Sequence, residues 1–210
     1  MLKSKKKIRI AIILAILAII LIVGGFMAVR IYNPFNTGIS PLLTANGQEQ
    51  TGKRLEISFS YEKQRMIASS QFAFWIEDMD GNYVDTLYVT RYTAQEGHHR
   101  RPKSIPLWVT AARPADMLPA EIDAIAGATP RSGDYRVIWD FTDSSGNSLT
   151  GTQYRYFIEG TMFNDDDVLY SGIITVGEEA WAEHPTPEYS VPDSSYKAML
   201  DAVRVAFYPN

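Results

Sequence analysis

The densest group of chemically active side chains is a run of histidines and arginines in the middle of the chain: His98, His99, Arg100 and Arg101. Paired guanidinium groups hold anions such as phosphate through charge-assisted hydrogen bonds, and histidine changes charge near neutral pH. The run therefore predicts a binding site for an anion or a protein partner. A solvated loop without a ligand is the alternative that the sequence leaves open.

Familiar metal and catalytic patterns do not accompany this run. A metal site at His98 and His99 would need a third ligand, such as His184 or a carboxylate, and no known ligand spacing is present. The Gly-x-Ser-x-Gly, phosphate-loop and paired-histidine helix patterns are missing too. The sequence therefore predicts no metal and no catalytic residues, and a hydrolase is the least favoured class of function.

A second group of interest is the small-residue stretch DAIAGAT at residues 123–129. It resembles the flavin-attachment motif of the FMN-binding domain family, Asp-x-x-Ser/Thr-Gly-Ala-Thr/Ser. In that family a transferase joins the phosphate of FMN to the last hydroxyl. The resemblance implies a cofactor site at Asp123, Gly127, Ala128 and Thr129, with FMN attached at Thr129.

This stretch departs from the motif at Ala126, where the family has a hydroxyl residue, and the other glycine-rich segments of FMN-binding domains are missing. The alternative is a tight turn that closes a short helix, with Gly127 just past the helix end and Pro130 ending it. Under that interpretation the chain carries no cofactor. The sequence therefore predicts no cofactor, and FMN is the alternative.

The composition excludes nucleic-acid binding. The formal net charge is −4, and five basic residues stand before residue 10, so the rest of the chain is distinctly acidic. The chain has no cysteine, which removes disulfides and thiolate sites. Its 12 Tyr, 9 Phe and 4 Trp suit a β-rich core.

Residues 10–29 form an uninterrupted apolar run that ends at Arg30. A helix of about 20 such residues spans about 30 Å, the thickness of a bilayer core. The run is longer than the apolar part of a cleaved signal peptide. Because the basic residues precede it, we expect a single-pass anchor in the cell membrane with a cytoplasmic N-terminus and an extracytoplasmic domain.

Alternating apolar residues predict strands at 54–61, 71–77 and 83–91, and the Asp80-Gly81-Asn82 turn predicts a hairpin between the last two. A second hairpin is expected from 135–141 and 153–162, followed by a strand at about 169–176. These strands favour an antiparallel sandwich. The connection at 92–133 is long enough to suggest function and is expected to hold short helices at 105–112 and 120–126.

The C-terminal segment shows apolar residues at helical spacing. They are Tyr196, Met199, Leu200, Val203 and Phe207. This pattern predicts an amphipathic helix that packs on the sandwich.

Residues 133–160 resemble the final hairpin of bacterial Ig-like domains of the flagellar-hook-cap type, through a Val-x-Trp-Asp strand and a Tyr-rich strand. The resemblance implies that Trp139 fills the core, and we expect Phe72 or Phe74 among its neighbours. Residues 54–176 are similar to a family of predicted periplasmic Ig-like proteins of unknown function. Some of its members are associated with extracytoplasmic redox systems, and the resemblance implies an association of this chain with such a system.

Together these patterns predict a mainly β protein: a basic segment at 1–9, an anchor at 10–29, a linker at 30–53, an Ig/fibronectin-like sandwich at 54–180, and a linker with a C-terminal amphipathic helix at 181–210. The expected function is that of a binding or accessory module of the bacterial cell envelope, without enzymatic activity. Its expected partners are the membrane and an envelope protein. An extracytoplasmic electron carrier with FMN at Thr129 is the alternative.

Overall fold

The structure, a computed structural model, describes residues 43–44, 51–64, 69–163 and 166–209. The chain divides into two compact units, Met1–Ile39 and Ser40–Asn210, and every described residue belongs to the second. The expected anchor, residues 10–29, lies outside the described residues. Within the described ranges no helix is both long and apolar enough to cross a membrane.

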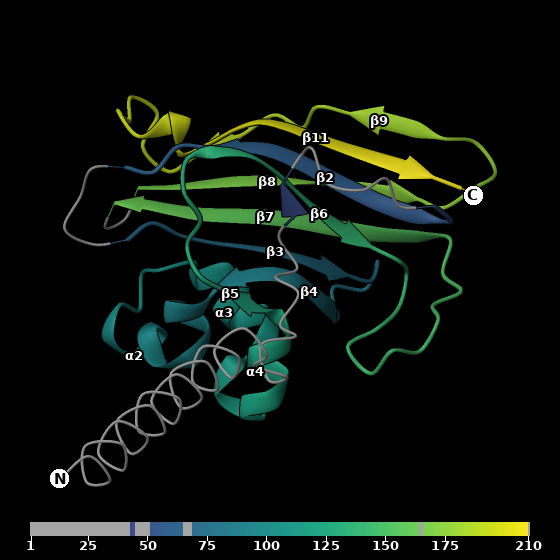
Figure 1. Cartoon of the computed structure of the whole chain (residues 1–210), viewed down its shortest axis with the longest axis horizontal. Helices are drawn as coiled ribbons and strands as arrows, with labels where there is room; N and C mark the ends of the chain where they lie inside the picture. The colour runs from purple at the N-terminus through teal and green to yellow at the C-terminus, as the bar shows by residue number, and fades with distance from the viewer. Residues whose placement is uncertain (1–42, 45–50, 65–68, 164–165, 210) are drawn as a thin grey trace, which may run out of the picture. The chain divides into compact units, whose positions relative to one another are not determined.

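Two β-sheets form the body of this unit (Figure 1). Sheet A has the strand order β1 (Leu43–Thr44), β6 (Gly133–Trp139), β2 (Arg54–Tyr61), β11 (Leu200–Tyr208) and β9 (Trp181–Glu183). Sheet B has the order β10 (Glu188–Tyr189), β8 (Asp166–Thr175), β7 (Gln153–Phe163), β3 (Gln71–Glu77), β4 (Tyr83–Thr90) and β5 (Ala126–Gly127). Neighbouring strands are antiparallel except β4 and β5, which are parallel.

The helical segments are short. They are η1 (Thr93–Gly97, a π-helix), α2 (His98–Arg100), α3 (Pro106–Ala112), η2 (Pro114–Asp116, a 3₁₀-helix), α4 (Pro119–Ile125) and η3 (Lys197–Met199, a 3₁₀-helix). All except η3 follow β4 directly, and we call residues 93–125 the helical insert. Figure 1 shows α2, α3 and α4 together on the side of β3 and β4 that faces away from sheet A.

The predicted elements of the first half are confirmed. Strands β2 and β3 have the expected bounds, and β4 ends one residue earlier than expected. The turn between β3 and β4 places Gly81 at a φ of 85°, a conformation that glycine adopts without steric cost. Helices α3 and α4 lie where short helices were expected, and each has proline in its first turn.

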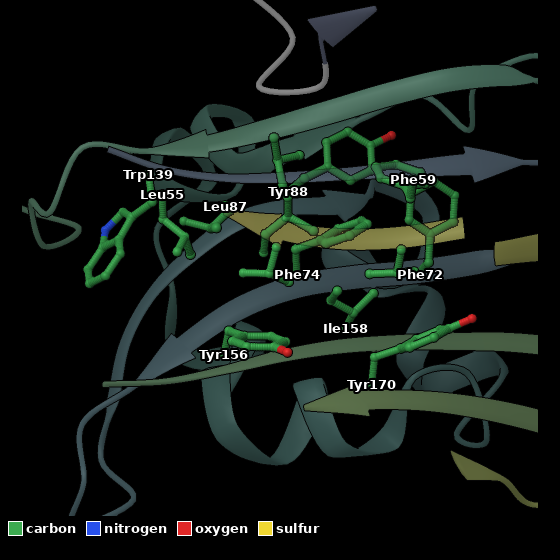
Figure 2. Close-up of a cluster of buried hydrophobic side chains, with 14 of the residues drawn as sticks. Leu55, Phe59, Phe72, Phe74, Leu87, Tyr88, Trp139, Tyr156, Ile158 and Tyr170 are labelled. Atoms are coloured by element: carbon green, nitrogen blue, oxygen red, sulfur yellow. The ribbon is translucent and has the colours of Figure 1, made fainter. Parts of the chain in front are cut away.

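A core rich in aromatic side chains lies between the sheets, as Figure 2 shows. Phe59 of β2 contacts both Phe72 and Phe74 of β3, with ring centroids 6.1 and 4.8 Å apart. Trp139 is 2% exposed, which confirms its predicted place in the core. Its ring contacts, however, are with Phe141 and Tyr154 rather than with the phenylalanines of β3.

A second core lies between sheet B and the helical insert. Trp75 of β3 and Val89 of β4 pack there with Trp108 of α3 and Ile122 of α4. Strand β3 consequently has six consecutive buried residues, because both of its faces are covered. The domain therefore has three layers, with sheet B in the middle, and the insert rests on a fixed apolar surface.

The predicted C-terminal helix is wrong, because this region forms β9, β10, η3 and β11. A bulge between Asp201 and Arg204, where Ala202 has a φ of 50°, interrupts the alternation of β11. It places the buried residues Leu200 and Val203 three positions apart, a spacing that imitates one face of a helix. The strand pairs with β2 and β9 in sheet A.

The predicted hairpin of residues 135–162 is also wrong. Strand β6 pairs with β1 and β2 in sheet A, whereas β7 pairs with β3 and β8 in sheet B. The segment between them therefore crosses from one sheet to the other. It contains a turn of its own, closed by Asp143, whose Oδ1 accepts from the backbone N–H groups of Ser145 and Asn147, each at 2.9 Å. That turn imitated the loop of a hairpin.

Candidate functional site

Buried polar side chains of sheet B hold the helical insert in place. Glu159 of β7 is 2% exposed and accepts hydrogen bonds from the backbone N–H groups of Leu107 (3.1 Å) and Trp108 (2.9 Å) at the start of α3. Two positions along β7, the Thr161 hydroxyl accepts from the backbone N–H of Ile105 at 2.7 Å. The first turn of α3 is thus fixed to sheet B by the free N–H groups of a helix start.

Burial raises the pKa of the Glu159 carboxyl from 4.5 to about 7, although its two N–H donors act in the opposite direction.

The beginning of the helical insert is held by Gln71 of β3. Its Oε1 accepts from the backbone N–H (3.3 Å) and the hydroxyl (3.0 Å) of Thr93, at the beginning of η1. These contacts make the insert a rigid platform rather than an open loop.

The π-helix η1 is a rare element that often occurs at functional sites. It depends on Gly97, because a Cβ there would lie 2.2 Å from the backbone carbonyl oxygen of Tyr92. This close approach carries the chain directly from η1 into α2, so that His98 turns toward Thr93. The expected binding run therefore starts at a wide helical turn that only glycine permits.

A pocket of about 620 Å³ lies beside η1 and α2, a volume typical of sites for small molecules. We call it the His98 pocket. It is lined by Tyr92, Gln95, Glu96, Gly97, His98, His99, Arg100, Pro114, Ala115, Met117, Pro119, Ile122 and Asp123. Three of the four residues of the expected binding run thus line one cavity, together with the loop before α4 and with α4 itself.

His98 supplies an unusual buried acceptor to this region. The side chain is 8% exposed, and its Nδ1 lies 2.9 Å from the carbonyl oxygen of Thr93. Because a carbonyl oxygen can only accept, Nδ1 carries the proton of this bond, and Nε2 of the neutral ring keeps a lone pair. Nε2 is buried and has no hydrogen-bond partner among the described residues. Such atoms are uncommon in folded proteins, so a donor from a ligand would be stabilised here.

Exposed charges of both signs surround His98. Glu96 and Asp123 are acidic, and Arg100 is basic. In the part of the chain that the structure describes, none of these three side chains forms an ion pair or a hydrogen bond. The ring of His99 lies against that of His98, with the centroids 4.1 Å apart. The pocket therefore presents unpaired groups that could contact both an anionic and a cationic centre.

Arg101 does not line the pocket, although it belongs to the predicted binding run. Its guanidinium donates to the backbone carbonyl of Ser69 at 3.0 Å and lies 5.7 Å from the ring centre of Tyr92. Arg101 therefore ties the insert to the segment before β3. The structure separates the two arginines into one pocket residue and one structural residue.

The residues of the flavin-like stretch are divided too. Asp123 on α4 lines the His98 pocket, whereas Gly127, Ala128 and Thr129 do not. In the alternative interpretation, the position of Gly127 just past the helix end is confirmed, because α4 ends at Ile125 and Ala126 is its C-cap. The expected tight turn is wrong, because Ala126 and Gly127 form β5 beside β4. Glycine is required there because a Cβ would lie 2.5 Å from the ring of Tyr88, whose hydroxyl donates to the Ala128 carbonyl at 2.8 Å.

Metal binding finds no support in the described ranges, where no group of three or more His, Cys, Asp or Glu residues could hold a metal ion. His184, which the sequence suggested as a third ligand, has its Nδ1 3.1 Å from the carbonyl of Val203 in sheet A.

A second pocket, of about 770 Å³, lies between β4 and α4. It contains Asp85, whose pKa burial raises to about 7, and Asp85 already accepts from the backbone N–H of Thr86.

Sequence reasoning missed Glu96 and the wall formed by residues 114–119. Glycine at position 97 was an available signal, because a glycine between polar residues and histidines can mark a close approach of the backbone. The pairing of Asp123 with the histidine run was not accessible from the sequence. It follows from the packing of α4 against η1 on sheet B.

The family model of a group described as predicted periplasmic proteins, DUF2271, matches residues 53–190. This match covers most of the described unit, including all of sheet B, strands β6, β2 and β9 of sheet A and the whole helical insert, while β1 and β11 lie outside it. The chain belongs to this family. Membership supports an extracytoplasmic location and the expected similarity to periplasmic proteins of unknown function. No curated protein and no solved structure shows a significant match to this chain.

Proposed function

We propose that this member of the DUF2271 family is an extracytoplasmic accessory protein that binds a small molecule in the His98 pocket. The observation that carries the proposal is the buried Nε2 of His98, a hydrogen-bond acceptor without a partner among the described residues, in a side chain that lines a cavity of about 620 Å³. Exposed Glu96, Arg100 and Asp123 around it would select a polar ligand.

The wider setting of this proposal combines sequence and fold. The apolar run at residues 10–29 supports a membrane tether with the domain outside the cytoplasm. Two facing, mainly antiparallel sheets support the Ig-like class of sandwich. A rigid sandwich that carries a helical insert with a pocket is a common way to present a binding site. An envelope protein partner would receive or deliver the ligand.

Filling the His98 pocket tests the proposal. Ala115 lines it and is exposed, so Ala115→Trp would occupy the cavity without disturbing either core. In a thermal-shift screen with a library of small polar metabolites, compounds that raise the melting temperature of the parent are expected to have no effect on Ala115→Trp. Ala124→Trp is the matched control, because Ala124 is exposed on α4 and lines the separate Asp85 pocket instead.

The control should respond to those compounds as the parent does. Compounds that stabilise the parent and Ala115→Trp equally would show that binding occurs elsewhere. A screen without any stabilising compound would contradict a small-molecule site.

A second candidate function is an electron carrier with FMN esterified on Thr129. The observation in its favour is that the Thr129 side chain is partly exposed, and its hydroxyl makes no hydrogen bond within the described part of the chain. An attachment site needs such an available hydroxyl. Ala126, however, is 3% exposed within the second core, between sheet B and the helical insert, so the hydroxyl residue that the motif has at this position would be buried here. FMN would supply redox chemistry, and the chain would supply the anchoring hydroxyl.

Co-expression with a flavin transferase tests this candidate. Fluorescence of the denatured protein band, together with a mass increase equal to that of an FMN ester, is expected for the parent and for Thr129→Ser. Thr129→Ala should lose both signals. Thr152→Ala is the control for a threonine on an exposed part of the chain and should keep both. A parent protein without fluorescence, or fluorescence that survives in Thr129→Ala, would eliminate attachment at this residue.

A further inference from the structure

The walls of the His98 pocket differ in chemistry from one element to the next. The segment from η2 to α4 contributes side chains that are mostly apolar, Pro114, Met117, Pro119 and Ile122. Elements η1 and α2 contribute Glu96, His98, His99 and Arg100, while α4 adds Asp123. The cavity therefore combines an apolar wall with groups that can contact a cation, an anion and a hydrogen-bond donor.

The protonation of His98 narrows the choice of ligand. Its Nδ1 donates to the Thr93 carbonyl. In a neutral ring, Nε2 therefore carries no proton and can only accept a hydrogen bond. A ligand that satisfies Nε2 of the neutral ring must therefore donate a hydrogen bond, which a carboxylate or a fully ionised phosphate cannot do. An ammonium group meets this requirement, and the carboxylates of Glu96 and Asp123 would compensate its charge.

Arg100 supplies the complementary part of the argument. Its guanidinium is exposed in the pocket and has no ion-pair partner in the ranges the structure describes. A planar guanidinium matches a carboxylate through two parallel hydrogen bonds. If only a cation bound, Arg100 would repel it, and if only an anion bound, Glu96 and Asp123 would repel it. A ligand that carries both charges avoids both costs.

We propose that the His98 pocket binds a zwitterion of the α-amino-acid class with an apolar side chain. This inference rests on the proposed small-molecule function and names the ligand class of the same site. The ammonium of the ligand contacts His98 Nε2 and the carboxylate of Asp123 or Glu96. Its carboxylate contacts Arg100, and its side chain lies against Met117 and Ile122. The cavity volume of about 620 Å³ also leaves room for a dipeptide.

Three probes of the same shape separate the contributions of the two charges. L-leucine carries both, 4-methylpentanoate lacks the ammonium, and 3-methylbutylamine lacks the carboxylate. Isothermal titration of the full chain is expected to give measurable binding of L-leucine or of L-leucyl-L-leucine, and binding of each single-charge analogue that is roughly tenfold or more weaker.

Variants assign each charge to a side chain. His98→Asn keeps a donor for the Thr93 carbonyl, because the asparagine Nδ2 takes the place of Nδ1, but it removes Nε2. We expect it to weaken L-leucine binding roughly tenfold or more. Asp123→Asn should weaken the binding of L-leucine but not of 4-methylpentanoate, and Arg100→Ala should weaken the binding of L-leucine but not of 3-methylbutylamine. Arg131→Ala, at an exposed position outside the pocket, should leave all affinities unchanged.

Three outcomes would overturn the inference: equal binding of L-leucine and its single-charge analogues, binding that His98→Asn and Arg100→Ala leave unchanged, or no binding of L-leucine and L-leucyl-L-leucine. Binding of Zn²⁺ alone that His98→Asn abolishes would also overturn it in favour of a metal. The proposed function fails separately. If L-leucine does not bind but other compounds stabilise the parent and not Ala115→Trp, only the ligand class is wrong.

Discussion

Replacement of Trp139 by alanine is expected to lower the free energy of unfolding by about 3–5 kcal/mol, a large part of the stability of a domain of this size. Trp139 lies on β6, is 2% exposed and packs at 4.4 Å from Phe141 and 5.1 Å from Tyr154, measured between ring centroids. Its indole N–H donates to the Thr142 carbonyl at 2.8 Å. The substitution removes all of these contacts and leaves a cavity between the sheets.

Urea denaturation of the full chain measures this change. Trp139→Phe is the control, because it keeps an aromatic ring in the core and loses only part of the volume and the hydrogen bond to Thr142. It is expected to cost less than half as much as alanine. A Trp139→Ala protein within about 1 kcal/mol of the parent would mean that the core between the two sheets does not depend on β6.

The strands were predictable where only one of their two faces is buried. Strand β2 alternates between buried and partly exposed residues along its whole length, so its bounds follow from the sequence. Strand β11 shows the limit of this reasoning. Its bulge at Ala202 depends on pairing with β2, a partner distant in the sequence. No local sequence pattern predicts this bulge.

The prediction of a hairpin between β6 and β7 failed for a related reason. The turn closed by Asp143 is a local feature and was predicted well enough to suggest a hairpin. Whether the strands on each side pair with one another is decided by the remaining strands of the two sheets. Local turn chemistry cannot distinguish a hairpin from a crossing between sheets.

The sequence identified some residues of the candidate site by their chemistry, but it did not identify the full set of residues that line the pocket. His98, His99 and Arg100 stood out because of their chemistry, and they do line one cavity. Arg101 looked equivalent in the sequence, yet the backbone directs it to Ser69. Glu96 and Asp123 join the site only because η1 and α4 pack side by side on sheet B. Tertiary packing therefore sets the charge balance of the pocket, and with it the class of ligand.

The buried carboxyl of Glu159 is expected to make stability depend on pH. Its pKa in the folded protein is raised to about 7 by burial, compared with an ordinary value of 4.5. Below about pH 4.5 the carboxyl is protonated in both states, and its contribution to stability is fully present. As the pH rises, the unfolded chain releases the proton first, so this contribution is lost progressively up to about pH 7. The expected loss is about 3 kcal/mol.

Glu159→Gln removes this titration, so the difference in the free energy of unfolding between pH 4.5 and 7.5 should shrink by about 3 kcal/mol relative to the parent. The readout is the slope with pH, because the amide also loses one of the bonds to α3 at every pH. Glu178→Gln, at an exposed position, should keep the slope of the parent. Asp85, whose pKa is raised to about 7 as well, adds a loss of the same sign that Glu159→Gln leaves in place. Equal slopes in the parent and in Glu159→Gln would show that Glu159 is ionised throughout this range and that its two N–H donors outweigh its burial.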